Sequence, residues 1–118
     1  MNTKLNNILF VIYILLIAIA SSIHGNNIPE LELFGSDKVL HILEYFLLGY
    51  LLINVLFDKT KYPGFLTFFL GSLFGVIDEI YQSTVFGRFP SSFDVIADVI
   101  GLTLSIILVQ KTSDIISR

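Results

Sequence analysis

The sequence predicts an all-α membrane protein, an antiparallel four-helix transmembrane bundle with both termini in the cytoplasm. Hydrophobic residues make up 54% of the 118 residues and charged residues only 14%, which is far less charge than a soluble domain of this size carries. The apolar residues fall into four runs of about 17–20 residues, the length that crosses a hydrocarbon core of roughly 30 Å. Backbone polar groups in lipid must find partners within the chain, so each run is expected to be a helix.

The first helix is expected over residues 5–23, where an unbroken apolar run follows Lys4. A cleaved signal peptide is the competing interpretation, because the Ala-Ile-Ala of residues 18–20 resembles a cleavage site. The run continues to nearly membrane-spanning length, which favours a retained helix. The second helix is expected over residues 37–57, where a polar lead-in at residues 36–38 precedes the second apolar run.

The third helix is expected over residues 65–82, after the Tyr-Pro-Gly of residues 62–64, because Pro and Gly mark breaks between periodic segments. Gly71 and Gly75 are four residues apart on this helix, and such small residues let a neighbouring helix approach closely. A self-dimerisation face is the alternative use of this pair, which leaves a homo-oligomer open. No segment between the helices is long enough for a second domain, so residues 1–118 form one domain.

The fourth helix is expected over residues 93–109. Its start resembles a capping box, with Ser91 as the cap and Asp94 three residues later. Asp94 is therefore also explained as a helix-start residue that the helix dipole favours. Asp98 lies one turn deeper, where neither the cap nor the dipole explains a carboxylate.

Basic residues are distributed unequally between the two sides of the predicted bundle. The outward side carries only Lys38 and Arg88. The positive-inside rule places the richer side, and with it both termini, in the cytoplasm. The basic residues on that side are Lys4, Lys59, Lys61, Lys111 and Arg118.

Ionisable side chains inside the apolar runs all fall at the outward end. Each costs roughly 2.5–3.5 kcal/mol to insert into a membrane, so a cluster of them is a candidate functional site. On each helix they follow i, i+4 or i+7 spacing and share one face, which brings the three faces into one layer below the outer interface. The candidate residues are Asp37, His41, Glu44, Tyr45, Asp78, Glu79, Gln82, Asp94 and Asp98.

Six carboxylates in so small a volume repel one another, so some must be protonated, hydrogen-bonded or matched by a cation. The candidate cations are Arg88, in the short outer loop, and a protonated His41. Arg88 is expected to pair with a carboxylate of the third or fourth helix. Lys38 is expected to extend its ammonium group into water instead.

The residue types suggest chemical roles. His41 is the candidate general acid or base, tuned by Asp98, Asp78 or Glu79, which complete the catalytic set. Arg88 would hold a phosphate or carboxylate through paired hydrogen bonds. The other candidates are assigned with Arg88 to substrate binding: Gln82, Tyr45, Glu44, Asp94 and Asp37.

Plainer interpretations stand beside these roles. His41 could be an imidazole buried for packing, Tyr45 an aromatic residue at the membrane interface, and Asp37 an exposed residue above its helix. Carboxylates with one histidine and no cysteine favour a hard cation such as Mg²⁺, Mn²⁺ or Ca²⁺, but no ligand spacing is diagnostic, so the cofactor stays unknown. No basic stripe exists, which argues against a nucleic-acid partner.

A family resemblance rests on two stretches of the chain. Residues 36–49 (SDKVLHILEYFLLG) resemble the first signature of the VanZ-like membrane proteins. Residues 78–82 (DEIYQ), Gly87-Arg88, and residues 94–98 (DVIAD) with Gly101 resemble the second, as does the Ser-Ser at residues 21–22. Phe86 departs from the pattern, because the family often has proline before its Gly-Arg.

The resemblance implies a small four-helix protein of the bacterial cytoplasmic membrane, whose namesake is associated with low-level teicoplanin resistance. The expected partners are then the lipid bilayer and a lipid-linked envelope precursor or glycopeptide. Two other functions stay open. A proton- or ion-coupled transporter would use the carboxylates as a relay, although they reach only part of the membrane depth and the inner half has few polar groups. A purely structural bundle would only satisfy their hydrogen bonds.

Overall fold

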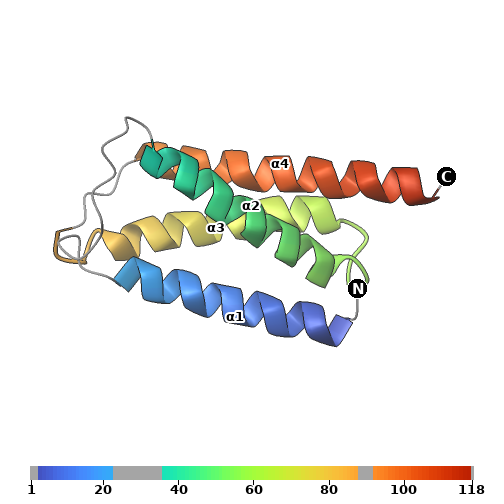
Figure 1. The fold of residues 1–118 in the computed structure, drawn as a ribbon, viewed down its shortest axis with the longest axis horizontal. Coiled ribbons are helices and arrows are strands. Elements are labelled where there is room, and N and C mark those ends of the chain that lie inside the picture. Colours follow the sequence, from blue (N-terminus) through green and yellow to red (C-terminus); the bar gives the residue numbers. More distant parts are fainter. Residues whose placement is uncertain (1–2, 23–35, 88–91, 118) are drawn as a thin grey trace.

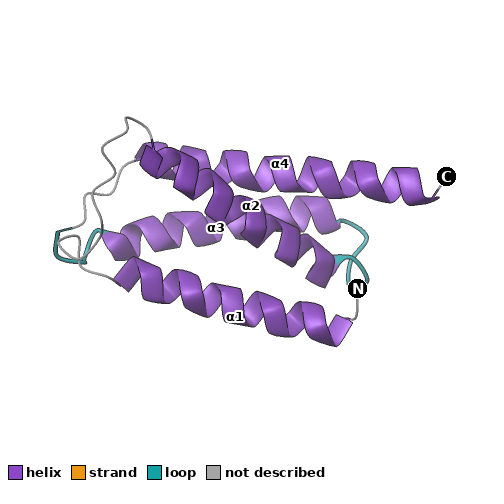
Figure 2. Ribbon diagram, in the orientation of Figure 1, coloured by secondary structure: helices purple, strands orange, loops and turns teal. Residues whose placement is uncertain are grey.

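The computed structural model describes residues 3–22, 36–87 and 92–117, with the side chains of residues 3–22, 38–87 and 92–113. All regular structure in this part of the chain is α-helical (Figures 1 and 2). Each of the four helices is long and apolar enough to cross a membrane by length and composition. The helices are α1 (Thr3–Ser22), α2 (Ser36–Leu56), α3 (Pro63–Gln82) and α4 (Ser92–Ser117).

The helix boundaries match the predicted ones to within two residues, except at the end of α4. The prediction that this helix ends at residue 109 was wrong, since α4 continues to Ser117. The end of an apolar run marks where a helix leaves the lipid, whereas residues 110–117 contain no proline or glycine to stop the helix itself. α3 starts two residues early, at Pro63, because a first-turn proline lacks an N–H that would be unbonded anyway.

The helices lie side by side, and their ends form the two opposite ends of the bundle (Figure 1). The starts of α2 and α4 lie together with the ends of α1 and α3, on the left of the view. Side-chain contacts join these ends, for example between Lys38 and Asp94 and between Ser21 and Gln82. At the opposite end, Lys59 Nζ donates a hydrogen bond of 3.1 Å to Asn7 Oδ1, joining the α2–α3 connection to the start of α1.

The most extensive helix pair, α2 and α4, depends on glycine. A Cβ atom at Gly101 would collide with the carbonyl oxygen of Ile42 and would lie 2.9 Å from the backbone nitrogen of Phe46. The backbone of α2 therefore rests directly on α4 at this point. Gly71 of α3 is similarly close to Leu102, because a Cβ added at Gly71 would lie 2.6 Å from the Cδ2 atom of Leu102. The close approach at Gly71 is the use that the spacing of Gly71 and Gly75 predicted.

The buried apolar core is centred on α2, which packs against α1 and against α4. Ile17, Tyr45, Leu48 and Leu102 form it, and Phe74 of α3 packs against it. Large apolar side chains cover the outside of all four helices, as expected where the surrounding solvent is hydrocarbon. The polar residues of the core are concentrated towards one end of the bundle, where the candidate site lies.

Candidate functional site

The central contact of the site joins α2 to α4. Nδ1 of His41 lies 2.8 Å from Oδ1 of Asp98, whose side chain is only 1% exposed. Asp98 precedes Gly101 by one turn, and His41 directly precedes Ile42, so the glycine contact between the two backbones also sets this pairing. Burial of a carboxylate this deep requires a hydrogen-bonded partner, and the imidazole supplies it.

Asp94 extends this contact towards the end of the bundle. Its Oδ2 atom lies 3.8 Å from Nε2 of His41, and its Oδ1 atom accepts a hydrogen bond of 2.5 Å from Nζ of Lys38. The prediction that Lys38 extends into water was wrong, because the lysine side chain reaches from α2 across to the first turn of α4. A partly buried ammonium group is more stable beside a carboxylate than in the surrounding hydrocarbon.

A second polar cluster joins α1 to α3. The Ser21 hydroxyl donates to Oδ1 of Asp78 at 2.5 Å and accepts from Nε2 of Gln82 at 3.2 Å. Gln82 Nε2 also lies 3.2 Å from Oδ2 of Asp78. All three side chains are buried. The Ser21 hydroxyl and the Gln82 amide are thus two neutral donors to the Asp78 carboxylate, and they tie α1 to α3.

Tyr45 occupies the space between α3 and Asp98. Its side chain is 0% exposed, and its hydroxyl has no hydrogen-bond partner in the described part of the chain. Its ring centroid lies 6.3 Å from that of Phe74. A Cβ at Gly75 would lie 3.3 Å from Tyr45 Cε2 and 3.1 Å from Asp98 Oδ2, so this glycine admits both side chains. Full burial excludes the alternative that Tyr45 is an interfacial aromatic.

The structure describes only some of the remaining predicted residues. Glu44 and Glu79 are half-buried, and the backbone carbonyl of Glu44 accepts a hydrogen bond of 2.6 Å from the Tyr13 hydroxyl. Asp37 lies in the first turn of α2, with its side chain outside the described residues. Arg88 and Ser91, with the ion pair and helix cap expected of them, also lie outside the described residues.

The site contains residues that were not among its predicted members. Ser21 was missed as a partner of Asp78, and the exposed pair Ser22 and Tyr81, 2.7 Å apart between Oγ and OH, was missed with it. A signal was present, since Ser21 lies four residues after Ile17 on the buried face of α1. Serine is common in apolar helices, however, and its hydroxyl can bond to its own helix, so the spacing alone does not assign a partner.

The half of the bundle away from the polar cluster holds more polar groups than expected, although they are neutral. Thr67 and Ser105 are fully buried, and Asn6 near the start of α1 is buried as well. The Ser105 hydroxyl donates to the Leu102 carbonyl of its own helix. Among the residues whose burial is described, the buried carboxylates are Asp78, Asp94 and Asp98, and all lie at the polar end.

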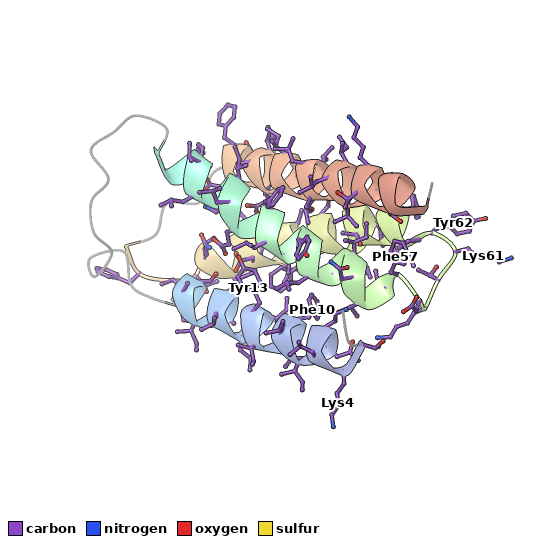
Figure 3. The ribbon with its side chains drawn as sticks, turned by 45° about the vertical axis from the view of Figure 1, so that its right-hand side comes forward. Lys4, Phe10, Tyr13, Phe57, Lys61 and Tyr62 are labelled. Carbon is purple, nitrogen blue, oxygen red and sulfur yellow. The ribbon has the colours of Figure 1, made fainter. Side chains whose placement is uncertain are left out.

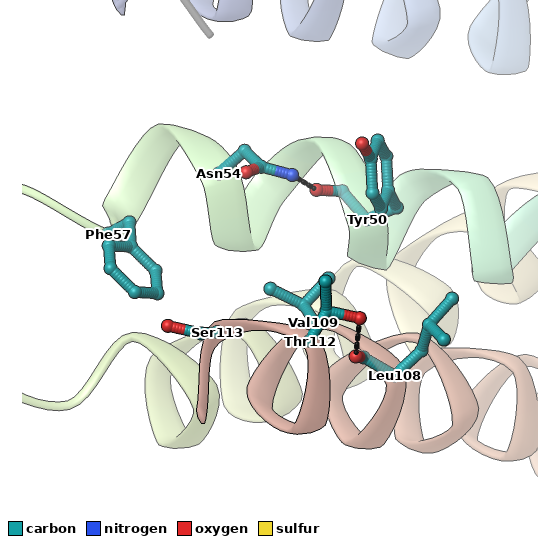
Figure 4. A pocket seen from close by; sticks show the side chains of 7 residues that line it. All are labelled: Tyr50, Asn54, Phe57, Leu108, Val109, Thr112 and Ser113. Carbon is teal, nitrogen blue, oxygen red and sulfur yellow. Dashed lines mark hydrogen bonds between the residues drawn. The ribbon is translucent and has the colours of Figure 1, made fainter. Parts of the chain in front are cut away.

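A cavity of about 440 Å³ lies at the other end of the bundle, between α2 and α4 (Figure 4). Two of its polar groups bond to their own helices: Asn54 Nδ2 donates to the Tyr50 carbonyl and the Thr112 hydroxyl donates to the Leu108 carbonyl. These groups do not converge on a common point, so this cavity is a weaker candidate site than the polar cluster.

The described residues contain no group of three or more His, Asp or Glu side chains arranged to hold a metal ion. The fold and the site together indicate a multi-pass membrane protein with a buried polar layer at one end of its helices. Comparisons of the chain with protein-family models, curated proteins and solved structures find no match.

Proposed function

We propose that this chain is a VanZ-like protein of the bacterial cytoplasmic membrane that binds a cell-envelope component at the outer face and contributes to resistance against teicoplanin-type glycopeptides. The observation that carries the proposal is the His41–Asp98 contact of 2.8 Å. An ionisable pair at membrane depth is expensive to maintain, so its presence favours a functional site over inert packing. The resemblance of the surrounding sequence to the VanZ-like signatures supplies the envelope context.

The distribution of lysines supports the orientation. Lys4 and Lys61 extend from the end of the bundle that lies opposite the polar cluster (Figure 3), and Lys59 lies there as well, bonded to Asn7. The positive-inside rule assigns that end to the cytoplasm. The helices then cross the membrane antiparallel with both termini inside, and His41 and Asp98 lie towards the outer face.

The chemistry of the pair suits recognition of a polar group. A carboxylate that accepts the Nδ1–H bond leaves Nε2 of the imidazole as the atom available to a ligand. Nε2 is 3.8 Å from Asp94, which is longer than a hydrogen bond. A hydroxyl or amide of an envelope molecule could donate to this nitrogen, and a general-base step would use the same atom.

Two other functions receive less support. A transporter needs polar groups through the full membrane depth, whereas the buried carboxylates of the described residues are confined to the outer end. A structural bundle accounts well for the Ser21–Asp78–Gln82 cluster, in which each member bonds the others. It accounts less well for His41, whose Nε2 atom has no partner within hydrogen-bond distance among the contacts of this site.

The test is expression of the full chain in a glycopeptide-susceptible Gram-positive host, with the inhibitory concentration of teicoplanin as the readout. Wild type should raise this concentration, and His41→Gln and Asp98→Asn should each abolish the rise at equal membrane levels of protein. Asp58→Asn is the matched control, because Asp58 is exposed in the connection at the opposite end. Full resistance from His41→Gln would leave a structural bundle as the better explanation, and no effect of wild type would remove the resistance role.

A further inference from the structure

Tyr45 carries a hydroxyl group that the bundle encloses without bonding it. The side chain is 0% exposed, and its oxygen has no hydrogen-bond partner among the described residues. The hydroxyls of Thr67 and Ser72 are also enclosed and unbonded, but a serine or threonine hydroxyl can rotate towards a carbonyl of its own helix. The rigid ring of Tyr45 holds its hydroxyl away from the backbone. A polar group buried at membrane depth needs a partner, and this arrangement of the helices does not supply one.

Asp98 is the neighbour that can supply an acceptor. Its Oδ1 atom makes the contact of 2.8 Å with Nδ1 of His41. Its Oδ2 atom lies beside Gly75 of α3, where an added Cβ would be 3.1 Å from Oδ2 and 3.3 Å from Cε2 of Tyr45. Cε2 is bonded to the ring carbon that carries the hydroxyl. The carboxylate and this edge of the ring therefore adjoin the same point, and Gly75 places no side chain there.

His41 and Tyr45 are two donors on one face of α2. They are four residues apart in the sequence, so they lie one turn apart on the same side of the helix. In this structure the imidazole holds Asp98, while the phenolic O–H, which can donate one hydrogen bond, holds nothing among the described residues. A turn of the carboxylate towards the ring would exchange one donor for the other.

The exchange matters when the imidazole binds a ligand. The side chain of His41 is 16% exposed and that of Asp98 only 1%, so a ligand reaches the imidazole first. A ligand that bonds Nε2 and turns the ring towards itself would break the contact with Asp98. A buried carboxylate without a donor is strongly unfavourable in a membrane. Such a ligand would bind weakly unless another group took the carboxylate.

We propose that Tyr45 is a second donor to Asp98, and that its hydroxyl takes the carboxylate when a ligand draws His41 away. This inference rests on the proposed function and assigns Tyr45 a positioning role that acts through Asp98. The unbonded hydroxyl belongs to the ligand-free arrangement of the site. Binding at His41 then replaces one hydrogen bond to the carboxylate with another and leaves no buried charge unpaired.

The contribution of the Tyr45 hydroxyl can be measured with and without the imidazole. His41→Ala removes the imidazole without a ligand and leaves no donor at that position. The readout is the unfolding equilibrium constant of the full chain in mixed micelles. In wild type, Tyr45→Phe should change this constant by about twofold or less. In the His41→Ala background, the same substitution should raise it about tenfold, because the hydroxyl then bonds a buried carboxylate.

Tyr13→Phe is the matched control. The Tyr13 hydroxyl already donates to the Glu44 carbonyl, so its loss should cost the same in both backgrounds. An equal effect of Tyr45→Phe in the two backgrounds would overturn the proposal. If both effects are large, the hydroxyl is already bonded in wild type, for example to an internal water molecule. If both are small, the hydroxyl does not reach Asp98.

Nuclear magnetic resonance provides a second measurement, which does not require the double variant to fold. In protein labelled with ¹³C at the Cζ atom of tyrosine, the Tyr45 signal is identified by its loss in Tyr45→Phe. This signal should move downfield in His41→Ala, as the hydroxyl begins to donate to a carboxylate, while the Tyr50 signal should stay in place. His41→Leu, which fills more of the space, serves if the alanine variant does not fold. An unmoved Tyr45 signal in a folded variant would overturn the proposal.

Neither measurement needs a resistance phenotype, so the two proposals can fail separately. A Tyr45 effect that depends on His41, in a protein without any effect on teicoplanin susceptibility, would remove the resistance role and leave the paired donors. His41-dependent resistance, with a Tyr45 effect that is the same in both backgrounds, would remove the role of Tyr45 and leave the polar site.

Discussion

His41 of α2 and Asp98 of α4 meet one turn away from the point where Gly101 rests on the backbone of α2, and Nδ1 of the imidazole is 2.8 Å from the Asp98 carboxylate. The two residues are 57 positions apart in the sequence. Their contact therefore depends on how closely α2 and α4 approach, which a residue without a side chain permits. The stability of this helix pair and the geometry of the candidate site are physically linked.

Gly101→Ala should separate α2 from α4 and destabilise the fold. The added Cβ would meet backbone atoms of Ile42 and Phe46, which cannot move aside as a side chain can. Overpacking of this kind costs about 1–3 kcal/mol, measurable as unfolding free energy in mixed micelles. Gly64→Ala is the control, because its Cβ would meet the flexible end of Gln110, and it should change stability by less than about 1 kcal/mol. Equal effects of the two substitutions would contradict this account.

The His41–Asp98 contact should contribute more to stability than the Lys38–Asp94 ion pair. A double-mutant cycle with His41→Gln and Asp98→Asn should give a coupling energy of about 1.5–3 kcal/mol, typical of a buried bond to a charged group. The cycle with Lys38→Gln and Asp94→Asn should give about 0.2–1 kcal/mol, because the lysine side chain is 34% exposed. A larger coupling for the lysine pair would reverse the ranking of the two contacts.

Ser21→Ala should destabilise the protein by about 1–3 kcal/mol, because it leaves Asp78 without one donor and Gln82 without one acceptor in a buried position. Ser22→Ala should stay within about 0.5 kcal/mol of wild type, since the Ser22 hydroxyl is exposed. Unfolding free energies of the two variants make the comparison. A neutral Ser21→Ala would mean that the α1–α3 cluster does not hold the helices together.

Tyr45→Phe should leave stability within about 0.5 kcal/mol of wild type, because the hydroxyl that it removes has no hydrogen-bond partner among the described residues. Tyr13→Phe, which loses the bond to the Glu44 carbonyl, should cost about 0.5–1.5 kcal/mol. The teicoplanin assay on the stable Tyr45→Phe protein then reports whether this hydroxyl faces a ligand. Destabilisation of Tyr45→Phe by more than that of Tyr13→Phe would show that the Tyr45 hydroxyl is bonded after all.

The helices and the end that carries the polar residues could be predicted from the order of residues alone. Apolar runs of membrane-spanning length locate the helices, and helical spacing identifies the face on which Asp94, Asp98, Gly101 and Ser105 lie. Local patterns of this kind need no knowledge of distant residues. His41 and Asp98 could be placed at the same end of the bundle for the same reason, since both lie about one to two turns from their helix starts.

The pairing of these side chains came instead from the way the helices pack. Asp98 meets His41, Asp78 meets Ser21, and Lys38 crosses to Asp94, so the single predicted layer is divided between two helix pairs. Spacing along one helix defines a face, but the neighbour of that face depends on the rotation and offset of another helix. Close contacts between residues far apart in the chain, such as Gly101 against Ile42, set that rotation and offset.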